Sequence, residues 1–208
     1  MHPMLIPYLE ADRIEAGCDE VGRGCLCGPV VAAAVVLPPS YANEWINDSK
    51  KVSKVNRQNL VEEIKGASLS WAIGEASVAE IDRVNILNAS FLAMERAITS
   101  LAISPDHLLI DGNRFKTNLK TPFTCIIKGD AKYASIAAAS ILAKVYRDEL
   151  MEKLAQTYPG YGWEKNVGYP TQLHREGIRK LGPTPIHRQS FKLLPDQLEI
   201  DFSEPPVK

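Results

Sequence analysis

The sequence predicts an α/β protein with one main hydrophobic core, and three observations support that prediction. Short apolar runs of strand length alternate with longer segments in which apolar residues recur at helical spacing. Of the 208 residues, 45% are hydrophobic and 24% are charged, so the chain can bury a sizeable core without disulfides. Residues 131–157 contain neither Gly nor Pro and are rich in Ala, which favours one long helix.

The elements expected before residue 103 are bounded by turn and capping residues. Pro38-Pro39 closes the second apolar run, and Ser53 can cap the first helix. The expected elements are strands at residues 14–20, 29–37 and 69–77, a helix from Ser53 to Gly66, and one or two helices within 78–102.

Two further short strands, at residues 107–110 and 123–127, are expected before the long helix at 131–157. After Thr157, repeated Gly and Pro residues break up a segment that still carries Tyr, His and Arg, which predicts short helices and turns. We therefore expect a catalytic domain at residues 1–157, a small helical cap packed on it at 158–194, and an acidic, Pro-containing tail at 195–208.

The cysteines and the N-terminus indicate a cytoplasmic protein. Four Cys residues are too few for a disulfide framework, and none has the spacing of a zinc finger. No apolar run approaches the ~18 residues of a membrane span, and the N-terminal stretch carries acids and Pro. We expect neither secretion nor insertion into a membrane.

The net charge of −1 conceals an asymmetry along the chain. Residues 114–192 carry 14 Lys and Arg against 6 Asp and Glu, so this half is basic and the remainder is acidic. Such a division indicates a polyanionic partner on one face, although chance segregation of solvated surface charge is the alternative. The aromatic residues of the cap either stack on sugars or bases or pack the cap onto the sheet: Tyr158, Tyr161, Trp163 and Tyr169.

Acidic residues end three of the expected strands. Asp19 and Glu20 end the first strand, Asp111 follows the fourth and Asp130 follows the fifth. Strand ends gather at one edge of an open sheet, and clustered carboxylates suit Mg²⁺ or Mn²⁺, which prefer oxygen ligands. The alternative is that each acid only begins a turn, because Asp beside Gly is a common turn dipeptide.

The loop Gly22-Arg23-Gly24 lies between the first two expected strands. Together with Gly28, its glycines resemble a dinucleotide-binding fingerprint in spacing, but that fingerprint opens a helix and this loop leads into a strand. Glycines also let a backbone approach a substrate closely, and Arg can bind a phosphate. A tight hairpin with a solvated Arg is the alternative.

The remaining reactive side chains leave their roles open. Cys18, Cys25 and Cys27 flank the glycine loop, either as thiolate metal ligands or as small buried hydrophobic residues. His174 and His187 are either a general base and a phosphate contact or structural groups.

Several blocks of the sequence stand in a fixed order between about residues 15 and 192: GCDEVGRGCLCGPVVAAAVVL, NDSKKVS, IDRVNI, IDGNRF, KGDAKYASIAAASILAKVYRD, YPGYGWEKNVGYPTQLHREGI and HRQSF. These blocks resemble bacterial ribonuclease HII, the type 2 ribonuclease H family. The resemblance implies a ribonuclease H-like fold, with a mixed sheet flanked by helices and a C-terminal helical cap.

The resemblance also implies roles for individual residues. Asp19, Glu20, Asp111 and Asp130 match the family's four metal-binding acids, with Asp19 and Asp111 as the main ligands of two Mg²⁺ or Mn²⁺ ions, Glu20 assisting one metal and Asp130 the other. Gly22, Arg23 and Gly24 match the family's GRG motif, which reads the junction between a ribonucleotide and DNA, and Tyr169 matches the Tyr that works with this motif around the 2′-OH.

Cys25 and Cys27 depart from the family pattern, because they stand where members often have Pro and Ala. This departure leaves the acids and the GRG motif intact and raises a question only about local packing and redox sensitivity.

The implied activity is that of a metal-dependent endonuclease. It hydrolyses the phosphodiester 5′ to a ribonucleotide in an RNA–DNA hybrid or within duplex DNA, leaving 3′-hydroxyl and 5′-phosphate ends. Six further basic residues are candidates for phosphate contacts: Lys50, Lys51, Lys128, Lys144, Arg147 and Arg188.

Two alternatives belong to other functional classes. A non-catalytic nucleic-acid-binding module would be favoured by the loss of an acid, and none of the four is missing. A hydrolase of small phosphate esters is disfavoured by the basic cap and the glycine loop. We expect a monomer, and the sequence leaves open whether a replication or transcription partner binds.

Overall fold

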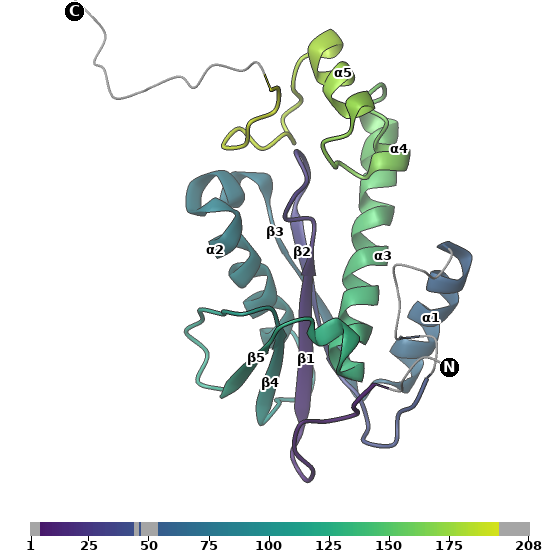
Figure 1. Ribbon diagram of the computed structural model, residues 1–208, viewed down its shortest axis with the longest axis vertical. Coiled ribbons are helices and arrows are strands. Elements are labelled where there is room, and N and C mark those ends of the chain that lie inside the picture. The colour runs from purple at the N-terminus through teal and green to yellow at the C-terminus, as the bar shows by residue number, and fades with distance from the viewer. Residues whose placement is uncertain (1–4, 44–45, 47–53, 196–208) are drawn as a thin grey trace, which may run out of the picture.

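A computed structural model describes residues 5–43, 46 and 54–195 of the chain (Figure 1). The predicted capping role of Ser53, the two candidate phosphate contacts Lys50 and Lys51, and the tail beyond Pro195 lie outside the described residues.

A mixed five-stranded sheet forms the centre of the fold, as predicted, with the order β3-β2-β1-β4-β5. The strands are β1 (Glu15–Val21), β2 (Val30–Val36), β3 (Ser70–Ala76), β4 (His107–Asp111) and β5 (Phe123–Ile126). The pairs β1/β2 and β2/β3 are antiparallel, whereas β1/β4 and β4/β5 are parallel. The parallel pairing of β1 with β4 brings the ends of these two strands to the same edge of the sheet.

Helices cover both faces of this sheet (Figure 1). The α-helices are α1 (Lys54–Ala67), α2 (Val78–Thr99), α3 (Ala134–Thr157), α4 (Trp163–Asn166) and α5 (Gln172–Leu181). The α2 helix packs on one face with alternate residues of β2, and α1 and α3 pack on the other face with the remaining residues of β2. Every residue of β2 is therefore buried, which explains why this strand is a continuous Val and Ala run rather than an alternating one.

One helix boundary differs from the prediction, and one predicted helical segment is broken, each for an identifiable reason. Residues Gly129–Ala131 form a 3₁₀ turn, η2, preceded by Lys128 in the left-handed conformation, so α3 begins at Ala134 rather than at residue 131. Within α2, Asn85 has a φ of 67° and its side chain accepts hydrogen bonds from the N–H groups of Leu87 and Asn88. Asn85 thus caps the second part of a broken helix, which agrees with an expectation of one or two helices.

Residues 158–194 pack around the C-terminal end of α3 and form their own hydrophobic cluster. Trp163 stacks on Tyr161 with ring centroids 4.9 Å apart, and His174 and His187 are buried beside them. Packing, rather than contact with a ligand, is therefore the role of these four side chains. The division into a domain at 1–157 and a cap at 158–194 stays a prediction.

No helix among the described residues is long and apolar enough to cross a membrane.

Gly17 determines how closely α3 approaches β1. A Cβ atom at this position would lie 2.2 Å from the carbonyl carbon of Ser135 and 2.4 Å from the backbone nitrogen of Ile136. Backbone atoms cannot give way as the end of a side chain can, so a larger residue would push the first turn of α3 off the strand. Because Asp19 lies two residues further along β1, this contact also sets the position of α3 relative to that carboxylate.

We expect Gly17→Ala to lower the free energy of unfolding by about 1–3 kcal/mol, because it overpacks a backbone contact. Urea denaturation would measure the change. Gly66→Ala is the matched control, because Gly66 lies in α1 with no atom within 4 Å of its Cβ position, and Ala is the better helix former there. Equal unfolding free energies for Gly17→Ala and the wild type would contradict the role given to this contact.

Candidate active site

The four predicted acids line one cleft of about 470 Å³. Asp19 and Glu20 are in β1, Asp111 ends the neighbouring parallel strand β4, and Asp130 lies in the η2 turn after β5. In the register of β1 and β4, Cys18 is opposite Ile110, so Asp19 and Asp111 follow at adjacent positions. The parallel pairing therefore brings together acids that are 92 positions apart in the sequence.

Asp19 is the most buried of these carboxylates, with 7% of its surface exposed. Its Oδ1 atom accepts a hydrogen bond of 2.7 Å from the N–H of Glu20. Burial raises the pKa of Asp19 well above its usual value, the negative charges of Glu20 and Asp111 raise it further, and a hydrogen bond from Ser140 opposes them. The hydrogen bonds to Asp19 are thus too few to offset the burial and the neighbouring negative charges that disfavour its ionised form.

Glu20 and Asp111 have one strong donor each. Glu20 forms an ion pair of 3.1 Å with Arg23, and this Arg opposes the rise in the pKa of Glu20 that burial causes. Asp111 Oδ1 accepts a hydrogen bond of 2.6 Å from the N–H of Gly129. Burial raises the pKa of Asp111, the Gly129 N–H lowers it, and the nearby charge of Asp130 raises it.

A divalent cation fits the chemistry of this cleft. The facing groups are carboxylate oxygens, which Mg²⁺ and Mn²⁺ prefer. Burial raises the pKa of three of the four, and the negative charges of neighbouring acids raise it further. Within the described parts of the chain, no three Asp, Glu, His or Cys side chains are gathered closely enough to form a complete ligand set. A cation would therefore have to draw the carboxylates together.

The Gly22–Gly24 loop forms one wall of the same cleft, as a tight turn in which the N–H of Cys25 donates to the carbonyl of Gly22. Gly22 has a φ of +93°, in the left-handed region that favours glycine. Gly24 lies against Tyr169, whose ring is 3.9 Å from the position of a Cβ atom on Gly24. The structure thus brings the glycine loop, Arg23 and Tyr169 to the four acids.

Arg147 and Arg188 do not have the role that the sequence predicted. Both are fully buried, so neither can reach a phosphate of a bound polyanion. Their guanidinium groups donate instead to backbone carbonyls: Arg147 to Cys27, Pro29 and Val167, and Arg188 to Gly22, Arg23, Gly28 and Pro29. Arg188 therefore supports the Gly22–Gly24 loop from inside the protein, whereas Arg147 holds the following residues, Cys27 and Pro29, and packs beside Gly22.

The remaining basic candidates have different positions. Lys144 lines the cleft, forms an ion pair of 2.8 Å with Asp148 and lies 6.0 Å from the centroid of the Tyr169 ring. Lys128 is exposed beside Gly129.

Two polar residues of the cleft, Arg57 and Ser140, are not among the residues predicted from the sequence. Arg57 is half-buried in α1, and its Nε atom is buried without a hydrogen-bond partner among the described residues. The only sequence signal for Arg57 was its place in the first helix after a polar, Lys-rich loop. Ser140 lies among the alanines of α3, where its small side chain suggests packing alone.

The cysteines of the loop are buried, and none joins a metal-binding group in the part of the chain that the structure describes. Burial raises the pKa of Cys27 to about 12, which keeps this thiol protonated at neutral pH. The prediction of small buried side chains therefore holds for Cys18, Cys25 and Cys27.

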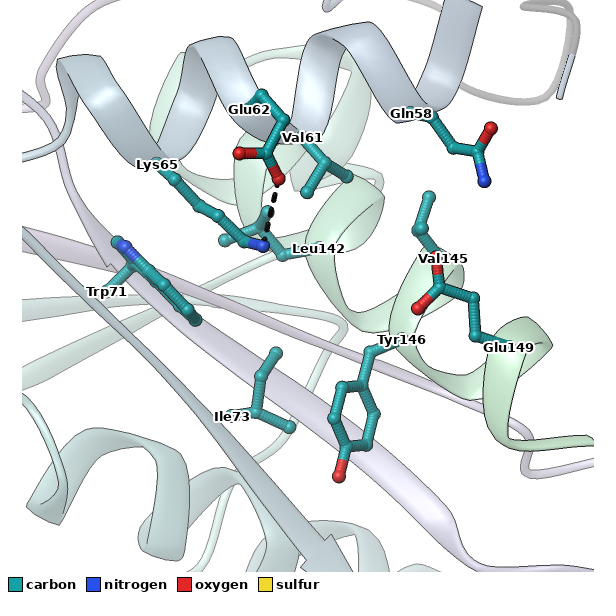
Figure 2. A pocket seen from close by; sticks show the side chains of 10 residues that line it. All are labelled: Gln58, Val61, Glu62, Lys65, Trp71, Ile73, Leu142, Val145, Tyr146 and Glu149. Carbon is teal, nitrogen blue, oxygen red and sulfur yellow. Dashed lines mark hydrogen bonds and ion pairs between the residues drawn. The ribbon is translucent and has the colours of Figure 1, made fainter. Parts of the chain in front are cut away.

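A second hollow, of about 630 Å³, lies between α1, α3 and β3 and contains none of the four acids (Figure 2). Its floor is apolar, and Lys65 spans its upper part with an ion pair to Glu62 while lying 5.2 Å from the centroid of the Trp71 ring.

Comparison with known proteins identifies relatives along nearly the whole chain. A family model described as Ribonuclease HII matches residues 16–194. A ribonuclease HII from Parabacteroides distasonis is 58% identical over 96% of this chain and 100% of its own length. One from Bacteroides thetaiotaomicron is 57% identical, again over 96% of this chain and 100% of its own length.

Solved structures show the same fold. The ribonuclease H2 of Pyrococcus horikoshii has 27% identity and a TM-score of 0.71, covering 86% of this chain and 94% of its own. The RNase HII of Archaeoglobus fulgidus, solved in complex with PCNA, has 25% identity and a TM-score of 0.71, covering 89% and 98%. Bst-RNase HIII, solved in complex with Mn²⁺, has 21% identity and a TM-score of 0.63, covering 82% and 63%. We take this last structure as a match of fold.

We expect Asp19→Asn to raise the melting temperature at pH 7 in the presence of a chelator. The neutral amide removes a buried charge that the protein compensates poorly, and a gain of ~1 kcal/mol corresponds to about 2–4 °C for a chain of this size. Adding Mg²⁺ or Mn²⁺ should then stabilise the wild type more than the variant. Asp12→Asn is the control, because Asp12 is exposed and its left-handed backbone accepts Asn equally well. A lower melting temperature for Asp19→Asn, with no effect of metal on the wild type, would refute the cation site.

Proposed function

This chain belongs to the ribonuclease HII family, and we propose that it cleaves the phosphodiester on the 5′ side of a ribonucleotide, leaving 3′-hydroxyl and 5′-phosphate ends. Family membership makes the chain a nuclease, a hydrolase of phosphodiester bonds with ribonuclease H activity on RNA–DNA hybrids. The observation that carries the finer proposal is the meeting of the four acids, the Gly22–Gly24 turn and Tyr169 in one cleft.

The carboxylates supply the hydrolytic part of the site. Asp19 and Asp111 would hold two divalent metals, with Glu20 assisting at one and Asp130 at the other. Bound there, the metals would activate the attacking water and stabilise charge on the leaving oxygen. The chain itself orients the ligands: Ser140 and the N–H of Glu20 fix Asp19, and the N–H of Gly129 fixes Asp111. Without these donors the carboxylates would turn away from the substrate.

The turn and Tyr169 supply the recognition of a ribonucleotide. The 2′-hydroxyl is both a donor and an acceptor, and it distinguishes RNA from DNA at one position. The N–H groups of the turn can donate to it or to the neighbouring phosphate, and the half-exposed Tyr169 ring can contact the sugar. The close approach of Gly24 to Tyr169 places both groups within reach of one nucleotide.

A basic segment beside the acids supports binding of a duplex. Residues 112–132 connect β4 to α3 and carry five exposed basic side chains and one acid. These side chains are Arg114, Lys116, Lys120, Lys128 and Lys132. Such residues would hold phosphates without regard to sequence, at an affinity that falls with added salt.

We propose a cytoplasmic monomer as the working form, and we assign no protein partner to it. The structure with PCNA concerns the archaeal relative.

The decisive test is cleavage of a DNA duplex that contains one ribonucleotide, beside an all-DNA duplex, with Mg²⁺, Mn²⁺ or a chelator. We expect a metal-dependent cut immediately 5′ of the ribonucleotide and none in the control duplex. Asp19→Asn should lose at least about 100-fold in rate while remaining folded, because it removes a metal ligand. Asp12→Asn should retain the wild-type rate. Cleavage of the all-DNA duplex, or full activity of Asp19→Asn, would rule out the proposed reaction.

We expect Arg57→Ala to weaken binding of the same duplex. Its buried Nε has no partner in the part of the chain that the structure describes, and Arg57 lines the cleft, where a phosphate can accept from the guanidinium. The plot of log affinity against log salt should lose about one unit of slope, as for one phosphate contact. Lys65→Ala is the control on the same helix, because Lys65 lies in the hollow of Figure 2. Identical slopes for the wild type and Arg57→Ala would exclude this contact.

A further inference from the structure

We propose that Arg188 is a positioning residue, which aims the N–H groups of the Gly22–Gly24 turn into the cleft. This inference rests on the proposed function, because it assigns the means by which the turn recognises a ribonucleotide. Arg188 lies in the cap, 166 positions from Gly22, and is fully buried. It touches no part of the cleft surface and acts only through the backbone of the turn.

Arg188 binds the two carbonyl groups inside the turn. Its Nη2 donates to the carbonyl of Gly22 at 2.7 Å, and its Nη1 donates to the carbonyl of Arg23 at 3.0 Å. Further bonds to the carbonyls of Gly28 and Pro29 hold the guanidinium itself in place. The planar guanidinium of Arg188 therefore holds the turn from the side that faces the protein interior.

Because the peptide bond is planar, the contacts of Arg188 with the carbonyl groups also fix the direction of the N–H groups on the opposite side of the turn. In a trans peptide the N–H points opposite to the C=O, so fixing the carbonyls of Gly22 and Arg23 also fixes the N–H groups of Arg23 and Gly24. These two N–H groups have no hydrogen-bond partner among the described residues, and the turn lines the cleft. Two adjacent free N–H groups with a common direction form a site for a phosphate or hydroxyl oxygen.

Arg is suited to this task because its planar guanidinium presents five donors and keeps its charge. Burial and the nearby charge of Arg147 lower the pKa of Arg188 to about 10, which still leaves it protonated at neutral pH. Lys has one nitrogen on a flexible stem and cannot reach two adjacent carbonyls in a fixed geometry while also binding Gly28. A Lys at this position would retain the charge and lose the alignment.

The neighbouring residue, His187, supports the other half of the proposed recognition site. Its Nδ1 accepts from the N–H of Thr184 at 2.8 Å, so the proton of a neutral His187 is on Nε2, which faces His174 Nε2 at 3.2 Å. His174 in turn has its Nδ1 3.0 Å from the carbonyl of Tyr169. Arg188 thus holds the turn, and the adjacent residue His187 supports the backbone of Tyr169 through His174.

The test is the preference for a ribonucleotide. Affinity would be measured in chelator, where no cleavage interferes, for a duplex with one ribonucleotide and for an all-DNA duplex. In Arg188→Lys the ratio of the two affinities should fall toward one while the all-DNA affinity stays unchanged. With metal added, the cleavage rate should fall about 100-fold, the size of effect that a misplacement of about 1 Å can cause. A loss of folded protein alone would lower both affinities equally and leave the ratio intact.

Arg175→Lys is the matched control, because Arg175 also lies in the cap and donates to a backbone carbonyl, that of Leu193, at 2.7 Å. It should keep the wild-type ratio. A wild-type ratio in Arg188→Lys, together with an unchanged affinity for the all-DNA duplex, would overturn the positioning role. Failure of the wild type itself to prefer or cleave the ribonucleotide duplex would overturn the proposed function instead.

Hydrogen exchange on the wild type provides a second measurement. It tests whether the amides of Arg23 and Gly24 face the ribonucleotide, even if Arg188→Lys does not fold. The amides of Arg23 and Gly24 should exchange rapidly in the free protein and slow at least tenfold with the ribonucleotide duplex, but not with all-DNA duplex. Equal exchange in the two complexes would show that these amides do not face the ribonucleotide and would overturn the inference.

Discussion

The rest of the structure depends on the close contact between α3 and β1 at Gly17. This contact sets the depth at which a 24-residue helix lies on the sheet, and the same helix then carries three side chains of the site. Ser140, Lys144 and Arg147 follow one another at spacings of four and three, so they share one face of the helix. Ser140 donates to Asp19, Lys144 lines the cleft, and Arg147 holds Cys27 and Pro29, which follow the glycine loop. One helix therefore aligns the acids with the turn.

The acidic side chains of the cleft and the buried guanidinium groups of Arg147 and Arg188 form no ion pair with one another among the described residues. The acids cluster without a sufficient cation, while Arg147 and Arg188 are buried with backbone carbonyls as their acceptors. A direct ion pair between the two groups would satisfy both and leave the carboxylates with no need of a metal. Because the guanidinium groups are occupied by carbonyls, the acids keep their demand for positive charge, and the cleft remains suited to a cation.

The sequence was sufficient for the elements and for the acids, but not for the supports behind them. The β2 strand was found because burial on both faces gives an unbroken apolar run, and Asp19 and Asp111 were found because they stand at strand ends. The prediction of phosphate contacts was wrong for Arg147 and Arg188, because both are buried and a basic side chain suggests a phosphate partner only while its real partners are unknown. Their partners are carbonyl groups, which every residue has, so no pattern of side chains reveals them.

The large sequence separation of the bonds made by Arg188 and Arg147 affects the order in which the protein folds during synthesis. The bond from Arg188 to Gly22 joins residues 166 positions apart, and the bond from Arg147 to Pro29 joins residues 118 apart. At about 5–20 residues per second, the ribosome makes the turn many seconds before the residue that aligns it. A nascent chain can pair its early strands in that interval, but the Gly22–Gly24 turn still lacks the bonds from Arg188. The backbone of this turn therefore takes its final form only when nearly the whole chain has emerged.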